Sequence, residues 1–525
     1  MKRYVLGVDI GTYSSKGVLV ALDGTIKASY TVNHGVEFPK PGFAEQDANK
    51  VWWHDFVSIV KALIDKGSIN PCEILAVGVS GIGPCVLPID SEGKPLRPGI
   101  LYGIDTRATE EIEYLEEKIG SDKILEITGR SKLSSQAAGP KILWIKRHEP
   151  DVFQRARWFL TSQSYIVFRL TNRAVIDVYS AAGYAPLFDI FKRQWVQEIA
   201  NEILRIECLP DVFWSYEIVG CVTKEAAFET GLLEGTPVVA GTTDAAAEAI
   251  SVGMSGVGDM MLMVGSSTFF VVRTPELMRS QNFWVSNFVE PNFFTVLGGT
   301  STAGSLTKWF RDQFGELEIE KEKTQGKDAY ESLAELAEKS PVGSKGLVVL
   351  PYFAGERTPI HDPASKGIIF GLTLAHTKGD IYRSVLEGVS YSIRHNLQEM
   401  SKEGVVPQRI LLAGGVLKNP LWVKLIADIT GFEMNIPNQQ IGASFGDAFL
   451  AAMGIKEFES VQEIERWVNV RSRVQPDASW KRIYDIKYQL YLELYKRTKD
   501  LMEIIHSLQV ELSGITPKAD RERRD

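Results

Sequence analysis

One carboxylate near the start of this sequence is followed by residues that suit phosphate chemistry. Asp9 ends an apolar stretch and leads into a turn with Gly11, Thr12 and Ser14. Glycine lets the backbone approach a phosphate, hydroxyl and N–H groups donate to its oxygens, and a carboxylate can hold magnesium. We therefore predict that this turn binds a magnesium–triphosphate, with Asp9 at the metal. The alternative is a plain hairpin.

A second carboxylate, Asp244, stands where the apolar stretch 237–240 gives way to Gly-Thr-Thr and then to a run of alanines. This order predicts a strand, a turn and a helix that begins near Asp244. The helix start favours an ionised carboxylate, which can take the proton of a hydroxyl that attacks phosphorus. We predict that Asp244 is a general base in contact with the substrate. A simple N-cap is the alternative.

The opening unit, two apolar strands joined by a glycine and hydroxyl turn, recurs about 250 residues later. The recurrence has predicted strands at 260–264 and 269–273. Its turn offers a second set of phosphate donors: Gly265, Ser266, Ser267 and Thr268. Since 525 residues exceed one hydrophobic core, the recurrence indicates two domains. We divide the chain into 1–253, 254–455 and a helical extension with a charged tail, 456–525.

A predicted strand at 410–415 ends in Gly414 and Gly415 and is the candidate for adenosine binding. Two glycines would let a flat adenine ring pack on the backbone, and Asn419 would bond the base or the ribose. The alternative is an ordinary strand–helix turn in which Asn419 is the N-cap before Pro420.

The composition excludes several other classes of function. Hydrophobic residues make up 44% of the chain and the net charge is −8, and because no basic stripe stands out we expect no nucleic-acid partner. No apolar run is long enough to span a membrane. The four cysteines form no CxxC pair, which favours reduced thiols in a reducing compartment, and we expect a cytoplasmic protein.

Together these residues resemble the FGGY family of carbohydrate kinases, and most closely its xylulokinase-like members. The resemblance spans about residues 4–455. Further segments that match the family pattern are Pro41-Gly-Phe-Ala-Glu-Gln-Asp47 with Trp52-Trp53, Asp105-Thr-Arg107, Gly367-Ile-Ile-Phe-Gly371, and Asp380 to Gly388.

The resemblance implies an α/β fold with two ribonuclease-H-like domains of the actin/hexokinase/Hsp70 superfamily and a cleft between them. The first domain would bind the sugar and the second ATP, with Mg²⁺ as cofactor. Asp244 would be the catalytic base and Asp9 the magnesium-associated aspartate. A homodimer is usual for the family.

The sequence departs from the xylulokinase pattern in the segment that would bind the sugar. Ser80, Gly81 and Ile82 are followed by Gly83-Pro84 in place of a Met-His pair. These residues and Asp105 are our candidates for sugar contacts, and Asp105 with Arg107 could equally be a structural ion pair. We predict an ATP-dependent kinase for a ketopentose such as xylulose, or a related sugar or polyol. The alternatives are a sugar-independent ATPase and a non-catalytic sugar sensor.

Overall fold

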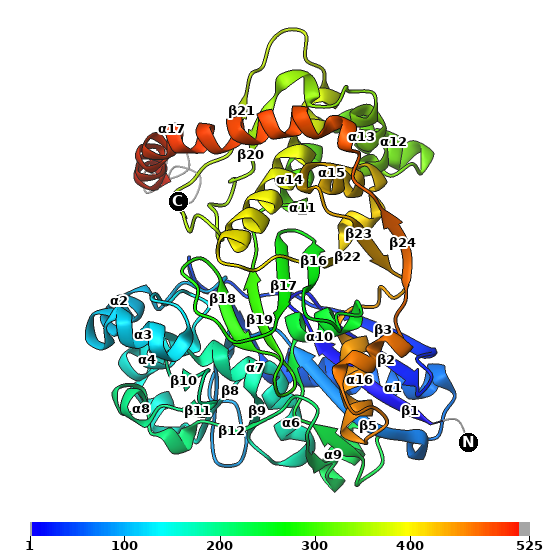
Figure 1. Ribbon diagram of the computed structural model, residues 1–525. Coiled ribbons are helices and arrows are strands. Elements are labelled where there is room, and N and C mark those ends of the chain that lie inside the picture. Colours follow the sequence, from blue (N-terminus) through cyan, green and yellow to red (C-terminus); the bar gives the residue numbers. More distant parts are fainter. Residues whose placement is uncertain (1–2, 514–525) are drawn as a thin grey trace, which may run out of the picture. The chain divides into compact units, whose positions relative to one another are not determined.

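The computed structural model describes residues 3–513 and builds them as two compact α/β units (Figure 1). Unit 1 consists of the chain up to Asp259, Val271–Val296 and Pro437–Asn469. Unit 2 consists of Met260–Phe270, Leu297–Ile436 and the described residues from Val470 onward. The predicted two-domain α/β architecture is thereby confirmed, and the predicted charged tail lies outside the described residues.

The two units do not follow the order of the chain. Pro437–Asn469 folds with unit 1, although the sequence division assigned this segment to the second domain and the extension. The division after residues 253 and 455 therefore stays a prediction about domains in the sequence, and the compact units cut the chain elsewhere.

The first sheet begins with the two predicted strands and a third that follows them. β1 (Tyr4–Ile10), β2 (Ser14–Ala21) and β3 (Ile26–Asn33) pair in antiparallel succession. β5 (Ile74–Gly81) runs parallel to β1, and the short β15 (Thr242–Thr243) runs parallel to β5. The sheet order is β13-β14-β5-β1-β2-β3, where β13 is Ile218–Cys221 and β14 is Pro237–Val239.

Successive side chains of β1 and β5 point to opposite faces of this sheet. Leu6 and Val8 of β1 join a large apolar core that also contains residues of α1 (His54–Gly67) and α6 (Ser162–Thr171). Alternation therefore puts Asp9 on the other face. Asp9 is in register with Ser80 of β5, so both side chains lie side by side on that face.

Two helices cover the face that carries Asp9, α10 (Asp244–Ser251) and α16 (Ala443–Gly454) (Figure 1). Helix α16 approaches the sheet through glycines. A Cβ added at Gly7 would lie 1.9 Å from a backbone oxygen of α16, and one at Gly78 would lie 2.1 Å from another. Only residues without a side chain permit this approach.

Further helices belong to unit 1. They are α2 (Thr109–Ile119), α3 (Ser121–Thr128), α4 (Ala138–His148), α5 (Pro150–Arg155), α7 (Val178–Ala181), α8 (Gln197–Ile203) and α9 (Lys224–Thr230).

The second seven-stranded sheet contains the predicted second hairpin as β16 (Asp259–Val264) and β17 (Thr268–Thr274). Its order is β18-β19-β17-β16-β22-β23-β24, with β18 Trp284–Asn287, β19 Phe294–Gly298, β22 Arg409–Ala413, β23 Met434–Pro437 and β24 Val470–Val474. The helices of unit 2 are α11 (Gly304–Phe314), α12 (Glu316–Gln325), α13 (Ala329–Glu338), α14 (Lys378–Lys402), α15 (Pro420–Thr430) and α17 (Lys481–Ser513).

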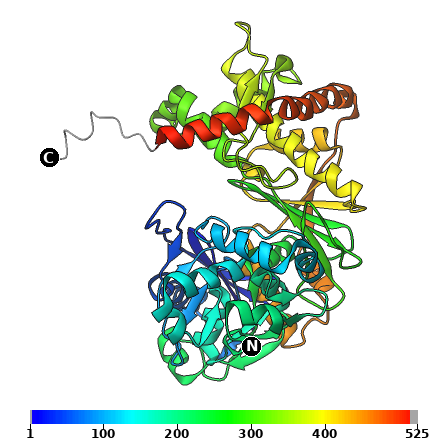
Figure 2. The ribbon, with the colours of Figure 1, turned by 90° about the vertical axis from the view of Figure 1, so that its left-hand side faces the viewer.

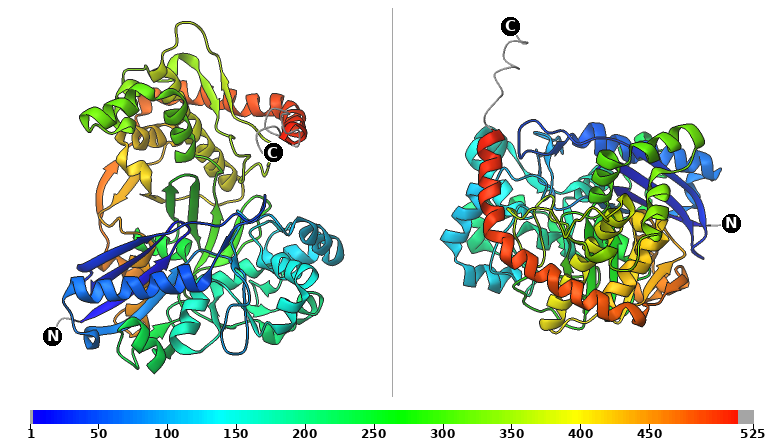
Figure 3. Two further views of the ribbon diagram at one scale, coloured as in Figure 1. Left: turned by 180° about the vertical axis from the view of Figure 1, so that it is seen from behind. Right: turned by 90° about the horizontal axis from the view of Figure 1, so that it is seen from above.

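The long helix α17, red in Figures 2 and 3, packs on α14 and α15. A buried ion pair joins it to α14: Lys487 contacts Glu387, and Glu387 also accepts from Arg383 at 3.0 Å. Glu387 belongs to the family-like segment 380–388, so that segment serves to dock the C-terminal helix. Among residues 3–513, no helix is both long and apolar enough to cross a bilayer.

Candidate active site

The centre of the site in unit 1 is a serine between two carboxylates. The Ser80 hydroxyl lies 3.0 Å from Asp9 Oδ1 and 2.7 Å from Asp447 Oδ2. Ser80 and Asp447 are completely buried, and Asp9 is 9% exposed. Asp9 reaches this point from the end of β1, Ser80 from the end of β5 and Asp447 from α16, so three segments far apart in the sequence converge here.

Asp244 is the first residue of α10, as predicted from the sequence, and it is half-buried. Its Oδ1 accepts a hydrogen bond of 2.7 Å from the backbone N–H of Ala245. The turn before it is anchored by Thr242, which donates to the buried Asp177 at 2.8 Å. Gly241 in that turn has φ +73°, and a Cβ there would lie 2.1 Å from the backbone oxygen of Val79, so glycine is required.

Burial and the charge of Asp9 raise the pKa values of the other carboxylates of this site. Burial raises the pKa of Asp244 above its usual range, and the charge of Asp9 raises it further. Glu248, one helical turn beyond Asp244, has its pKa raised to about 7 by burial and by the charge of Asp9. Burial and the same neighbour raise the pKa of Asp447. The cluster therefore favours either protonation or a bound cation.

The first phosphate turn is held from outside by side chains. Gln46 donates to the backbone oxygen of Thr12 at 2.8 Å, and its own amide oxygen accepts from Trp52 at 2.8 Å. His34 contacts the backbone oxygen of Gly11 at 3.0 Å. The Gln46–Trp52 bond explains why the family-like segment 41–47 is followed by tryptophan: it fixes the turn that carries Gly11, Thr12 and Ser14.

The predicted sugar-contact residues Ser80, Gly81 and Ile82 are all buried. Ile82 is fully buried and bonded through its N–H to Ile10 at 2.9 Å. Gly81 packs so closely on Ser162 that an added Cβ would lie 2.4 Å from its hydroxyl. Thus Ser80, Gly81 and Ile82 come together at the end of β5, in the strand next to Asp9.

Asp105 and Arg107 form the ion pair that the sequence left open as an alternative. Arg107 Nη2 lies 2.7 Å from Asp105 Oδ2 and 2.7 Å from Glu45 Oε1. Asp105 also accepts from the backbone N–H of Ala44 at 2.7 Å, and its side chain is completely buried. These bonds tie the segment that contains Gln46 to the segment 105–107.

The second predicted phosphate turn, Gly265 to Thr268, lies in unit 2 and rests on the start of α11. The backbone oxygen of Gly265 accepts from Gly304 at 2.8 Å, and that of Ser266 accepts from Ala303 at 2.9 Å. The Thr268 hydroxyl is buried and lies 2.7 Å from the hydroxyl of Thr300. The start of α11 therefore supports the backbone of the turn. The side of the turn that carries Ser266 is exposed.

The adenosine candidates follow β22 in unit 2. Gly414 has φ +92°, and a Cβ there would lie 2.6 Å from the backbone oxygen of Val264 at the end of β16. Both Gly414 and Gly415 are exposed, and no atom lies within 4 Å of a Cβ added at Gly415. Asn419 Oδ1 accepts from Trp422 N at 3.1 Å, so Asn419 is the N-cap of α15.

Sequence reasoning missed several residues that this geometry brings to the site. Asp447 lies 367 positions from its partner Ser80, and no local pattern marks it. Gln46 lies in the family-like segment 41–47, but no role was predicted for its side chain. Arg357 donates to the backbone oxygens of Thr268 and Thr300, at 3.0 and 2.6 Å, and thereby fixes the second phosphate turn.

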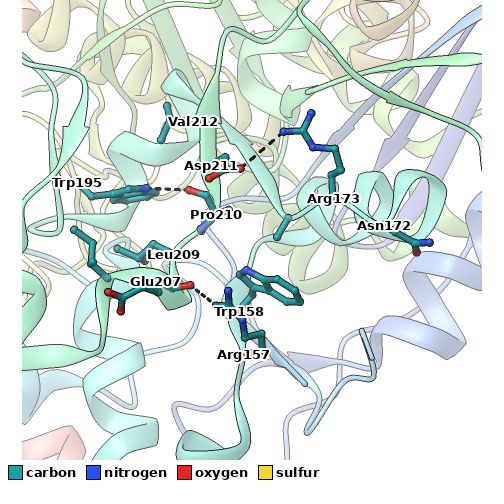
Figure 4. Close-up of a pocket in the computed structure, with 12 residues that line it drawn as sticks. Arg157, Trp158, Asn172, Arg173, Trp195, Glu207, Leu209, Pro210, Asp211 and Val212 are labelled. Atoms are coloured by element: carbon teal, nitrogen blue, oxygen red, sulfur yellow. Dashed lines mark hydrogen bonds and ion pairs between the residues drawn. The ribbon is translucent and has the colours of Figure 1, made fainter. Parts of the chain in front are cut away.

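A separate pocket of about 550 Å³ in unit 1 contains none of the predicted site residues (Figure 4). Its polar rim is largely paired within the protein: Trp195 donates to the oxygen of Pro210 at 2.9 Å, and Arg173 lies 3.8 Å from Asp211. We assign it no part in catalysis.

Two α/β units with glycine- and hydroxyl-containing turns, and an aspartate at the start of a helix beside buried carboxylates, are the parts that a phosphotransferase needs. A family model confirms the class and names it. The N-terminal domain of the FGGY family of carbohydrate kinases matches residues 4–251, and its C-terminal domain matches 260–455. The chain therefore belongs to the FGGY family of carbohydrate kinases, and it is an ATP-dependent sugar kinase.

Relatives agree with this assignment over nearly the whole chain. A xylulose kinase of Bacillus subtilis is 30% identical over 97% of this chain and 99% of its own length. A xylulose kinase of Escherichia coli is 29% identical over 95% and 99%. The crystal structure of xylulose kinase from Rhodospirillum rubrum matches with a TM-score of 0.86 and 28% identity, over 95% of this chain and 100% of that one.

Within the described residues, no three His, Cys, Asp or Glu side chains gather in an arrangement that would by itself hold a metal ion. The carboxylate oxygens of Asp9 are nevertheless of the kind that Mg²⁺ accepts, because Mg²⁺ prefers hard oxygen ligands and retains several waters. One oxygen of Asp447 is buried and has no hydrogen-bond partner. The site thus fits Mg²⁺ brought in with a nucleotide better than a dedicated protein cage.

Proposed function

We propose that this kinase phosphorylates a ketopentose such as xylulose, or a related sugar or polyol, with Asp244 as the general base. The observation that carries the proposal is Asp244 at the start of α10, half-buried and bonded to Ala245 N through one oxygen. Its carboxylate would accept the proton of the sugar hydroxyl while the hydroxyl oxygen bonds to the γ-phosphorus of ATP. The bond from that phosphorus to ADP breaks in the same step.

The electrostatics of the site support this role. A general base works best when its pKa lies near the operating pH. Burial first, and the charge of Asp9 second, raise the pKa of Asp244 from its usual acidic range toward neutrality or above. This makes Asp244 a stronger base than a surface carboxylate.

The nucleotide would be held by the residues predicted from the sequence. For the phosphates we propose Gly11, Thr12, Ser14, Gly265, Ser266, Ser267 and Thr268. For adenosine we propose Gly414, Gly415 and Asn419. The exposure of both glycines and the open space at Gly415 support contact with a flat base.

Mg²⁺ forms part of the proposal, with Asp9 as the residue that would hold it. Mutual repulsion among buried carboxylates would fall when a divalent cation enters. Bound with ATP, the ion would neutralise charge on the β- and γ-phosphates.

For the sugar we propose the strand end formed by Ser80, Gly81 and Ile82, which lies in the strand beside Asp9. Asp105 would act indirectly, because its bonds to Arg107 and Ala44 hold the segment that contains Gln46 in place. The names of the relatives favour xylulose. The Gly83-Pro84 pair in place of Met-His is the reason to test other sugars as well.

The test is a coupled assay of ADP release over ketopentoses, aldoses, deoxy-sugars and polyols, with wild type and Asp244→Asn. We expect sugar-dependent ADP release, highest with a ketopentose, and a loss of about 10²- to 10⁴-fold in kcat in the variant, the contribution typical of a general base. MgATP binding by calorimetry should stay within about threefold of wild type, since the variant keeps the shape of the side chain. Asp211→Asn, an exposed carboxylate, is the matched control.

Near-normal turnover in Asp244→Asn would refute the assignment of the base. An equal rate of ADP release without sugar would favour a sugar-independent ATPase, and binding of sugar without turnover would favour a sensor. We also place the enzyme in the cytoplasm, where ATP is available and unpaired cysteines stay reduced; all four cysteines are unpaired. The homodimer stays a prediction.

A further inference from the structure

The Ser80 hydroxyl connects a third carboxylate to the site. Asp447 is in no motif that the sequence indicated, yet its Oδ2 lies 2.7 Å from the Ser80 hydroxyl, closer than Asp9 Oδ1 at 3.0 Å. Asp447 and Ser80 are both completely buried. The three side chains thus form a continuous chain of contacts from α16 through β5 to β1.

The backbone fixes the separation that this chain of contacts requires. A Cβ added at Gly78 would lie 2.1 Å from the backbone oxygen of Asp447 itself. On the other side of α16, a Cβ at Gly446 would lie 2.0 Å from the backbone oxygen of Ala247 in α10. Helix α16 is therefore held at van der Waals distance between the sheet and the helix that carries Asp244, and Asp447 has no freedom to move away.

Counting protons shows what Ser80 can do. A serine hydroxyl has one proton and donates it to one acceptor at a time. Two carboxylates at hydrogen-bond distance from one hydroxyl therefore need a further proton, which a buried carboxyl can supply. Both contacts are satisfied when the Asp447 carboxyl donates to Ser80 while Ser80 donates to Asp9.

We propose that Asp447 is a positioning residue for phosphoryl transfer, which acts through Ser80 to fix the orientation of the Asp9 carboxylate. With one Asp9 oxygen held by Ser80, the rotation of that side chain is fixed and its other oxygen keeps a constant direction. This role rests on the proposed function, because Asp9 matters for catalysis only if it serves the magnesium–nucleotide.

The test compares Asp447→Ala, Asp447→Asn and Ser80→Ala in the full-length enzyme. Residues that orient a metal-associated ligand typically change metal affinity or activity by about 10- to 100-fold. We expect Asp447→Ala to raise both the Mg²⁺ concentration for half-maximal rate and the Kd of MgADP measured by calorimetry by at least about 10-fold. Asp447→Asn should restore both toward wild type, because an amide can donate to Ser80 and accept from it.

Further variants separate positioning from general stability. Ser80→Ala should reproduce Asp447→Ala, and the double variant should show no added loss, because both remove the same link. Phe449→Leu is the matched control. Phe449 is buried on the same helix and packs on Phe458 and Trp467. The Phe449→Leu variant should have a lower free energy of unfolding than wild type, with no change in the Mg²⁺ concentration for half-maximal rate.

The outcomes are distinct. Equal impairment of Asp447→Asn and Asp447→Ala would show that the negative charge itself is needed, and would overturn positioning through a hydrogen bond. Normal MgADP affinity in Asp447→Ala would overturn it as well. If Asp447→Ala does not fold, Ser80→Ala decides the question by the same measurement. The MgADP titration needs no sugar turnover, so a failure of the proposed substrate or base leaves this test intact.

Discussion

Replacing Gly78 by alanine is the sharpest test of how the site in unit 1 is assembled. Gly78 lies on β5, two residues before Ser80, and faces α16. The new Cβ would lie 2.1 Å from the backbone oxygen of Asp447, 2.8 Å from its carbonyl carbon and 3.4 Å from the Cβ of Ala451. Two of the three contacts involve backbone atoms, which cannot swing away as a side chain does.

The geometry gives the size of the effect. Real Cβ contacts essentially never fall under 3.0 Å, so α16 or β5 must move by about 0.9 Å in Gly78→Ala. Gly7 and Gly446 pin the same helix on both sides, so it cannot shift without new clashes. Overpacking of this kind costs about 1–3 kcal/mol, and occasionally more. We expect the upper end of that range, together with weaker MgADP binding because Asp447 moves with the helix.

The assay is urea denaturation followed by tryptophan fluorescence. Trp467 packs on Phe445 and Phe449 of α16 at ring distances of 5.4 and 5.3 Å, so its emission reports on this helix. Gly35→Ala is the control: the site is exposed, and no atom lies within 4 Å of the added Cβ. A Gly78→Ala protein with the denaturation midpoint and MgADP affinity of wild type would refute the close packing of α16 on the sheet.

Two further predictions concern charge. The rate should rise with pH as Asp244 loses its proton. Because the charge of Glu248 raises the pKa of Asp244, Glu248→Gln should shift the acidic limb of the kcat/KM profile to lower pH. An unchanged acidic limb would contradict this. Lys487→Met should lower the free energy of unfolding by about 3 kcal/mol, because it leaves the carboxylate of Glu387 short of a partner in a buried site. The exposed Lys481→Met should cost less than about 1 kcal/mol in the same denaturation experiment.

The local parts of the fold could be predicted from the sequence because local rules decide them. Short apolar runs on either side of a glycine and hydroxyl turn gave β1 and β2, and the same pattern gave β16 and β17. The alanine run after Asp244 gave α10, with its first residue correctly placed. In each case the signal lies within about ten residues, where periodicity and turn chemistry act.

The sequence alone could not decide between the alternative roles of Asn419 and Asp105, because each role depends on which group the side chain contacts in the folded protein. Asn419 is bonded as an N-cap through its side-chain oxygen. Asp105 is paired with Arg107 inside the protein. A buried pair and an exposed contact use the same residue types at the same spacing, and only burial distinguishes them.

Asp447 shows why a catalytic site can extend beyond its motifs. The segment from Pro437 to Asn469 follows the strands and helices of unit 2 in the sequence, yet it folds with unit 1. The small residues of this segment do not reveal its partner, because glycine permits a close approach and does not choose what approaches. The partner is set by Gly7 in β1 and Gly78 in β5. These glycines lie two residues before Asp9 and Ser80, and so on the same face of the sheet. The spacing that admits the helix is therefore the spacing that brings its carboxylate to Ser80, so packing and chemistry at this site depend on the same two strands.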